Sequence, residues 1–287
     1  MKIVQGDKVD EVVRQFQHRQ GKFIHRKLMT GEPGSPGNFA LELVRTTDDF
    51  FSPRHMHNFD QIRYQVDGEF DFDRNGKMNP GVIGYFPEGT RYGPQTSSVS
   101  SLTLVLQFGG ASGSGYMTQE QMEASTAELK NHGRFEKGVY RRNDDVEGKR
   151  NVDGYQAVWE NVNKRPMKYP EPRYNDPIMM NPAHFDWVPV EGAPGVYDKL
   201  MGVFTERRSQ AQFLKLDPQA KYRTHGRCIY VVLKGEGQVA GDGYRRFTTV
   251  LCEEGDDPTF VAASETEILA LGLPRLGRAA HQAVAAQ

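Results

Sequence analysis

Two stretches of the chain consist of short apolar segments that turn residues interrupt at brief intervals. The first lies between residues 40 and 108, and the second begins near residue 184. Segments such as VIGYFP, SLTLVLQF and CIYVVLK are rich in β-branched and aromatic residues, which predicts short strands in a barrel or sandwich. Each stretch contains an aliphatic-x-Gly-Glu turn, at Val66–Glu69 and at Leu233–Glu236. We therefore expect an all-β fold in which one domain was duplicated.

The segment between the two stretches has a different texture. Thr118 and Gln121 form a capping-box pattern, good helix formers follow, and Gly133 stands where such a helix would stop. The chain is then charged and, toward residue 183, rich in proline. The sequence therefore predicts an N-terminal barrel at 1–115, a helical and Pro-rich connection at 116–183, and a C-terminal barrel at 184–287.

Composition narrows the class of partner. The 287 residues carry a net charge of -1, and no concentrated basic face for nucleic acid or a membrane surface is evident. The start lacks the apolar core of a signal peptide, and no apolar run approaches the roughly 20 residues that span a bilayer. We expect a cytoplasmic protein with a small-molecule substrate. Cys228 and Cys252 are expected to be free, buried thiols.

Two shorter pieces flank the predicted barrels. Residues 9–17 (VDEVVRQFQ) are amphipathic, and residues 278–287 (RAAHQAVAAQ) read as weakly helical or frayed.

The stretch RHMHNFDQIRYQVDGEF, which begins at Arg54, contains the residues best suited to chemistry. Side chains alternate faces along a strand, so His55 and His57 point the same way. If the register continues, Gln61, Arg63 and Gln65 share that face. Imidazoles suit Fe, Zn, Cu, Ni and Mn, so the two histidines are candidate metal ligands.

If Arg63 is buried inside the barrel, its positive charge needs a partner. A buried arginine without a partner is costly, and the only acid in phase with it, Asp67, falls in the Asp-Gly turn. Either an acid from another strand pairs with Arg63, or an anionic ligand does. We hypothesise that Arg63 binds a substrate carboxylate or enolate, since a guanidinium suits planar anions.

The first β-region resembles a cupin. The first motif of that family is a Gly, five residues, H-x-H, three or four residues, Glu, six residues and Gly. The second is a Gly, five residues, P-x-G, two residues and His. The matching positions in this chain are His55, His57, Gln61 and Gly68 for the first motif, and Gly81, Pro87, Gly89 and Tyr92 for the second. The resemblance covers roughly residues 40–108 and implies a double-stranded β-helix (jelly-roll) barrel.

The chain departs from the family at two ligand positions. Gln61 stands in place of the family's Glu, Tyr92 in place of its third His, and the leading Gly of the first motif is missing. The resemblance implies a divalent first-row metal held by His55 and His57 with Gln61 and Tyr92, with Fe(II) in first place and Zn, Mn, Ni or Cu as other choices. The alternative is that the two histidines are hydrogen-bonded relics without a metal.

The second β-region resembles the anti-sigma-factor type of cupin. Aligned on Gly235, it places Tyr222 and Thr224 at the H-x-H positions and Cys228 at the Glu position. We therefore expect the second barrel to be a structural partner without a metal.

Two classes of function remain open. The first is a metal-dependent bicupin enzyme, most like a dioxygenase, acting on a small anionic organic substrate. Arg63 and Tyr92 would be catalytic, and Gln65, Gln95 and Gln107 would bind substrate with Arg63. The alternative is a metal-free or non-catalytic ligand-binding bicupin, for sensing or storage, or one with the acid-base chemistry of an isomerase or epimerase. By analogy with other cupins, a homodimer is expected.

Overall fold

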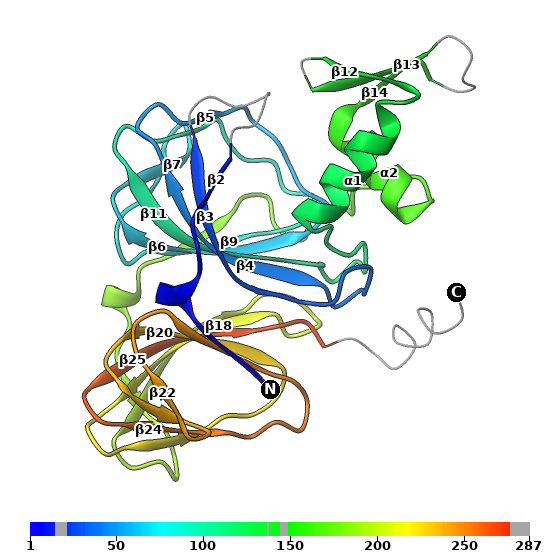
Figure 1. Ribbon diagram of the computed structural model, residues 1–287. Coiled ribbons are helices and arrows are strands. Elements are labelled where there is room, and N and C mark those ends of the chain that lie inside the picture. Colours follow the sequence, from blue (N-terminus) through cyan, green and yellow to red (C-terminus); the bar gives the residue numbers. More distant parts are fainter. Residues whose placement is uncertain (15–21, 137, 144–148, 276–287) are drawn as a thin grey trace.

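The computed structural model describes residues 1–14, 22–136, 138–143 and 149–275. These residues form two β-barrels that lie against each other, with a small helical unit beside the first barrel (Figure 1). The strand pairs within the barrels are antiparallel, as the closely spaced turns predict. The all-β fold with two jelly-roll barrels is therefore confirmed.

The first barrel is built from a large sheet and a small sheet. The large sheet runs in the order β15 (Ile178–Met180), β9 (Ile83–Phe86), β6 (Asp60–Asp67), β11 (Ser101–Phe108), β4 (Phe39–Thr46), β3 (Phe23–Thr30) and β2 (Val12–Arg14). The small sheet runs in the order β5 (Phe51–Ser52), β10 (Gln95–Thr96), β7 (Phe70–Asp73) and β8 (Gly76–Met78).

The second barrel repeats this arrangement. Its large sheet runs in the order β1 (Lys2–Gln5), β23 (Thr248–Cys252), β20 (Cys228–Lys234), β25 (Thr266–Gly272), β18 (Gln210–Leu216), β17 (Val196–Val203) and β16 (Val188–Pro189). Its small sheet runs in the order β19 (Lys221–Arg223), β24 (Thr259–Ala262), β21 (Gly237–Val239) and β22 (Asp242–Tyr244). The matching order supports the duplication predicted from the sequence.

Each barrel takes one outer strand from the part of the chain that precedes the other barrel. Strand β1 pairs with β23 of the second barrel, with Lys2 opposite Leu251. Strand β15, which follows the connection, pairs with β9 of the first barrel, with Met180 opposite Ile83. The barrels are therefore bound to each other by reciprocal exchange of strands, and the boundaries at 115 and 183 stay a prediction.

Side chains alternate between the two faces of β6, and this alternation places the predicted site residues Gln61 and Arg63. Its even-numbered residues face the second barrel: Ile62 lies in the shared apolar core, and the Tyr64 ring lies 5.6 Å from the Phe213 ring. Its odd-numbered residues, among them Gln61 and Arg63, are buried inside the first barrel. The register predicted for this strand therefore holds, because one face is needed for the apolar contact between barrels.

The helical unit contains more structure than its sequence suggested. It consists of α1 (Gln119–Leu129), α2 (Gly154–Asn163) and a small sheet of β12 (Gly133–Glu136), β13 (Val139–Arg142) and β14 (Asn151–Asp153). The predicted capping box at Thr118 and Gln121 is present in both directions. The helix ends at Leu129, however, and Gly133 begins β12 instead of ending α1.

Short 3-10 turns lie at Gly6–Lys8 and Pro182–His184. Within the amphipathic segment 9–17, residues Val12–Arg14 form an edge strand against β3. The rest of that segment, and the tail 278–287, lie outside the described residues. Among the described helices, none combines the length and apolar character of a membrane span.

Candidate active site in the first barrel

Backbone pairing brings the two motif segments together. His55 and Tyr92 exchange backbone hydrogen bonds of 3.0 Å in both directions, and the Gly89 amide donates to the His57 carbonyl at 2.8 Å. The His55 ring lies 4.9 Å from the His57 ring and 4.7 Å from the Tyr92 ring. The sequence separation of 35 residues between His57 and Tyr92 is thus closed by strand pairing, and the three side chains form one cluster.

Gln61, Arg63 and Tyr92 form a buried polar triangle deeper in the barrel. Arg63 Nε and Nη2 both donate to Gln61 Oε1, at 2.9 and 2.5 Å, and Nη2 also donates to the Tyr92 hydroxyl at 3.1 Å. Gln61 and Tyr92 are each 1% exposed and Arg63 is 8% exposed. The predicted site residues Gln61, Arg63 and Tyr92 therefore lie in direct contact.

The Arg63 guanidinium has no carboxylate partner among the residues that the structure describes. The guanidinium instead makes cation–π contacts with three aromatic rings. Its carbon lies 4.2 Å from the centre of the Phe86 ring, 5.4 Å from that of Tyr92 and 6.0 Å from that of Phe70. Burial lowers the pKa of Arg63 below its usual value, which reflects the cost of holding a cation in an apolar cavity. Of the two alternatives left open by the sequence, pairing with an acid on another strand does not occur within the described residues.

The donor set fits a metal only in part. His55 Nδ1 lies 2.7 Å from the Pro53 carbonyl oxygen, so Nδ1 is the protonated nitrogen in the neutral ring and Nε2 carries the lone pair. Gln61 Oε1, in contrast, already accepts two N–H groups from Arg63 and has no lone pair to spare. No group of three or more His, Cys, Asp and Glu side chains suited to a metal occurs in the described part of the chain. His55 and His57 suit two ligand positions, and Gln61 as it lies suits none.

The three other glutamines differ in how they are engaged. Gln65 is fully buried, and its amide bonds the Asp67 and Gly68 carbonyls while accepting from the Thr103 hydroxyl, so it braces the turn after β6. Gln107 lies opposite Gln61 on β11 and accepts from the Tyr116 hydroxyl at 2.8 Å. Gln95 is buried on β10, and its Nε2 has no hydrogen-bond partner among the described residues. Of the three, Gln65 is committed to the turn, whereas substrate binding by Gln95 and Gln107 stays a prediction.

Sequence reasoning missed a second polar pair that faces the same interior. His25 Nδ1 lies 3.0 Å from Glu42 Oε2, and both side chains are mostly buried. Strand register places Glu42 and Arg63 on either side of Val105, two strands apart and about 10 Å from each other. The alternation of side chains along the strands could have predicted this pair. On β4, Glu42 lies between the core residues Leu41 and Leu43 and therefore points to the opposite face of the sheet.

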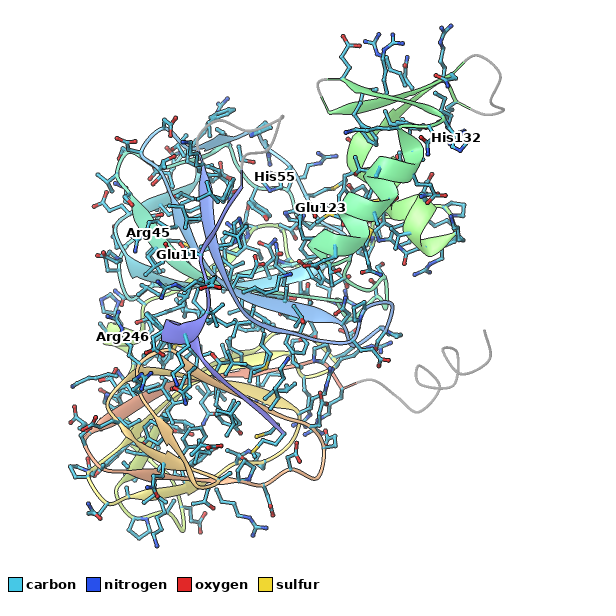
Figure 2. All side chains as sticks on the ribbon, viewed as in Figure 1. Glu11, Arg45, His55, Glu123, His132 and Arg246 are labelled. Carbon is cyan, nitrogen blue, oxygen red and sulfur yellow. The ribbon has the colours of Figure 1, made fainter. Side chains whose placement is uncertain are left out.

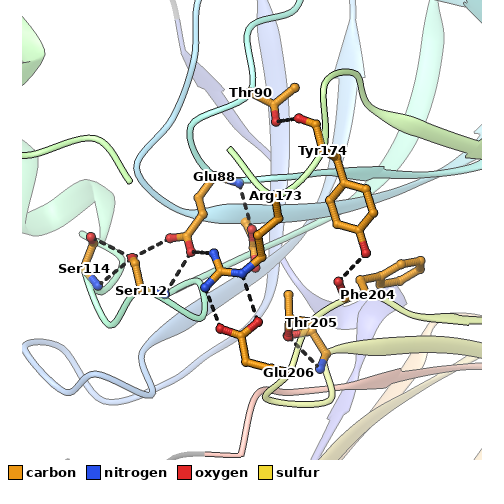
Figure 3. A network of polar contacts seen from close by, with 11 residues as sticks. Glu88, Thr90, Ser112, Ser114, Arg173, Tyr174, Phe204, Thr205 and Glu206 are labelled. Carbon is orange, nitrogen blue, oxygen red and sulfur yellow. Dashed lines mark hydrogen bonds and ion pairs between the residues drawn. The ribbon is translucent and has the colours of Figure 1, made fainter. Parts of the chain in front are cut away.

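A network of polar contacts anchors the loop that carries Gly89 (Figure 3). The buried Glu88 carboxylate accepts from Ser112 and from Arg173 of the connection, at 2.7 Å for Arg173. Arg173 also makes a two-pronged contact with Glu206 of the second barrel, at 2.6 and 2.9 Å. The Glu88 amide donates to Asp60, and burial raises the pKa of Asp60 to about 7.

In the described part of the second barrel, the residues aligned with the first-barrel motif are not two histidines. Tyr222, Thr224 and Cys228 are all buried, and Tyr222 and Cys228 belong to an apolar cluster. Cys228 and Cys252 are free and stand directly opposite each other on β20 and β23, which confirms the prediction of free, buried thiols.

Comparison with known proteins places the fold. No family model and no curated protein matches the sequence. Among solved structures, a proposed dioxygenase from Nostoc punctiforme is similar, with 12% identity, a TM-score of 0.64, and coverage of 96% of this chain and 82% of that one. Oxalate decarboxylase from Bacillus subtilis, with Mn(II) centres, has 14% identity, a TM-score of 0.53 and coverage of 96% and 78%. A pirin from Escherichia coli in complex with nickel(II) has 11% identity, a TM-score of 0.51 and coverage of 96% and 99%.

The fold is therefore that of the two-barrel cupins, as the sequence predicts. Two of these similar structures carry divalent metals, so the fold accommodates such ions. At this level of identity the similarity establishes the architecture alone.

Proposed function

We propose that the first barrel binds a small organic anion at Arg63 and acts on it as a metal-dependent cupin enzyme, in the manner of a dioxygenase. The observation that carries the proposal is the buried Arg63 guanidinium, whose only polar partners in the described chain are neutral side chains. A carboxylate or enolate from solution would neutralise this charge with bidentate hydrogen bonds.

In this proposal Arg63 and Tyr92 both contact the anion. Arg63 holds and orients the anion, which takes the place that Gln61 Oε1 occupies in this structure. The Tyr92 hydroxyl, 3.1 Å from Arg63 Nη2, lies beside the same anion and donates a hydrogen bond to it. The Phe70 and Phe86 rings exclude water, which strengthens both contacts.

His55 and His57 would hold a divalent first-row metal, with Fe(II) the first candidate. When bound there, such an ion supplies Lewis-acid and redox chemistry. Two imidazole ligands would leave the rest of its coordination sphere open. Both histidines are half-buried whereas Arg63 and Gln61 are deeper, so the row of side chains runs from the barrel mouth inward.

The test of the metal is its content in purified, untagged protein, measured by plasma mass spectrometry after anaerobic incubation with Fe(II). The wild-type protein is expected to retain close to one equivalent and the His55→Ala/His57→Ala variant none. His132→Ala/His184→Ala, which removes two exposed histidines elsewhere, is the matched control and is expected to retain the metal. Equal metal content in the two double variants, or no metal in the wild-type protein, would contradict the proposal.

The test of turnover is O₂ consumption by the Fe(II)-loaded protein with 3,4-dihydroxybenzoate and phenylpyruvate, a catecholic and an enolic acid. The Arg63→Met variant is expected to keep its metal and lose activity through a raised KM. Loss of metal in Arg63→Met would instead indicate that Arg63 supports the metal ligands.

One observation favours a second candidate, proton transfer without a metal. The His25–Glu42 pair has the arrangement in which a carboxylate orients an imidazole as a general base. It faces the same interior as Arg63, about 10 Å away by strand spacing. A metal-free protein that exchanges the α-proton of a 2-oxo acid in D₂O, and loses this exchange in the Glu42→Gln variant, would support this candidate.

A further inference from the structure

A crevice of about 500 Å³ lies between the two barrels, on the opposite face of the large sheet from Arg63. Its apolar floor comes from the first barrel, with Ile24, Leu43, Val66 and Leu102. Phe247 from the second barrel forms the facing wall. Charged side chains, among them Arg45 and Arg246, line the crevice beside these apolar residues. A cavity of this size that combines an apolar surface with a few polar groups suits a small molecule.

Three arginines surround this apolar floor: Arg26 on β3, Arg45 on β4 and Arg246 between β22 and β23. In Figure 2, Arg45 and Glu11 lie close together on the first barrel, and Arg246 lies at the junction with the second. Register places Arg45 in one row with Ile24 and Leu102. The guanidinium groups therefore border a continuous apolar strip.

The charges of the crevice are only partly matched. Arg26 Nη2 bonds Glu11 at 2.9 Å. Neither Arg45 nor Arg246 has an ion pair within residues 1–14, 22–136, 138–143 and 149–275. The other acid of the lining, Asp67, is exposed at the rim. Three arginines against two acids leave a net positive charge, which favours an anion.

The Arg246–Phe247 wall is held in an uncommon conformation. Phe247 has a φ of 65°, which is strained for a bulky aromatic residue. Two backbone hydrogen bonds fix it, from Phe247 N to Val232 O at 2.7 Å and from Gly6 N to Phe247 O at 3.2 Å. The Arg246 guanidinium stacks on the Phe247 ring at 4.6 Å. The exchanged N-terminal segment thus helps to hold a cation and an aromatic ring against the crevice.

We infer that this crevice is a binding site for an amphipathic organic anion, one with an apolar body and a single carboxylate or sulfonate group. The apolar body lies on the strip of Leu102 and Ile24 and against Phe247. The anionic group bonds Arg45 and Arg246. Because the lining comes from both barrels, the bound anion stabilises their packing.

The test uses 8-anilinonaphthalene-1-sulfonate, an anionic fluorescent probe, and its uncharged relative N-phenyl-1-naphthylamine. The wild-type protein is expected to bind one equivalent of the anionic probe, and its Tm to rise with probe concentration. The Arg45→Gln/Arg246→Gln variant should bind the anionic probe about tenfold more weakly or worse, with unchanged binding of the neutral probe.

One control separates this site from other exposed arginines. Arg74→Gln, at an exposed turn, should bind the anionic probe like the wild-type protein. Arg246→Glu, at an exposed position where folding is not at risk, should abolish binding by itself. The inference is overturned if the wild-type protein shows no saturable binding, if the double variant binds within twofold of it, or if the Arg74→Gln control weakens equally.

Discussion

Replacing Arg63 with methionine should make the protein more stable and unable to bind its ligand. The guanidinium is buried without a carboxylate, and the transfer of such a cation from water costs several kcal/mol. Methionine has a similar length, and it fits the aromatic surroundings of Phe86 and Phe70. The Tyr92 hydroxyl, 3.4 Å from Gln61 Oε1, remains as a partner for that oxygen.

The expected gain is about 1–3 kcal/mol in the free energy of unfolding, because exchange of buried ionic groups for apolar ones is often neutral or stabilising. The matched control is Gln65→Met, two residues along the same face of β6. It removes three hydrogen bonds and leaves the Thr103 hydroxyl and two carbonyl oxygens without them. Gln65→Met should therefore lower the free energy of unfolding by about 2–4 kcal/mol.

The two variants are compared by urea denaturation, with tyrosine and tryptophan fluorescence as the signal. Opposite signs for Arg63→Met and Gln65→Met would support a functional Arg63 that is kept at a cost in stability. If Arg63→Met instead destabilises by about 3–5 kcal/mol, as expected when a buried ion pair is broken, Arg63 is a structural residue and the proposed anion site fails.

Three further predictions concern other parts of the molecule. Iodoacetamide should modify Cys228 and Cys252 slowly at pH 8 in the native protein and fast in urea. The reason is that burial raises the pKa of both thiols, to about 12 for Cys228. Fast labelling of the native protein would refute this prediction. In the folded protein the pKa of Asp60 is raised to about 7, so Asp60 keeps its proton at pH values where the unfolded chain has lost it. The free energy of unfolding should therefore fall by on the order of 4 kcal/mol as the pH rises from about 4 to 7. Asp60→Asn should remove this slope in denaturation curves. Gly68→Ala should cost more stability than Gly81→Ala: both have positive φ, but only at Gly68 would the added Cβ clash with a neighbouring carbonyl oxygen.

The strands and the inner face of β6 were predictable because period-two alternation is a local signal. Alternation along the strand predicted that Gln61, Arg63 and Gln65 share one face before any contact was known. The spacing of the two motifs also placed Tyr92 beside the histidines. What the spacing does not fix is where a side chain's hydrogen bonds go, so the commitment of Gln61 Oε1 to Arg63 and of Gln65 to the turn emerged only from the structure.

The features that escaped prediction depend on contacts between distant parts of the chain. Strands β1 and β15 are short, and each pairs with an edge strand of the opposite barrel, β23 or β9. The local sequence pattern does not predict such a pairing. The His25–Glu42 pair unites two adjacent strands, and neither residue has a motif. The sheet of β12, β13 and β14 is charged along its length, so its residues resemble a loop in composition.

The polar network connects the second barrel to the candidate site of the first. Gly89, next to Glu88, donates to the His57 carbonyl, so the position of His57 depends on the same loop that Glu88 anchors. Glu88 is held by Arg173, and Arg173 is held by Glu206 of the second barrel, which lowers the pKa of Glu206 to about 2 (Figure 3). The network therefore extends from the second barrel to the backbone of a candidate metal ligand. Through Glu206, the second barrel thus contributes to the contacts that fix the loop beside His57, and groups that fix the position of a ligand are as important to a site as the ligand itself.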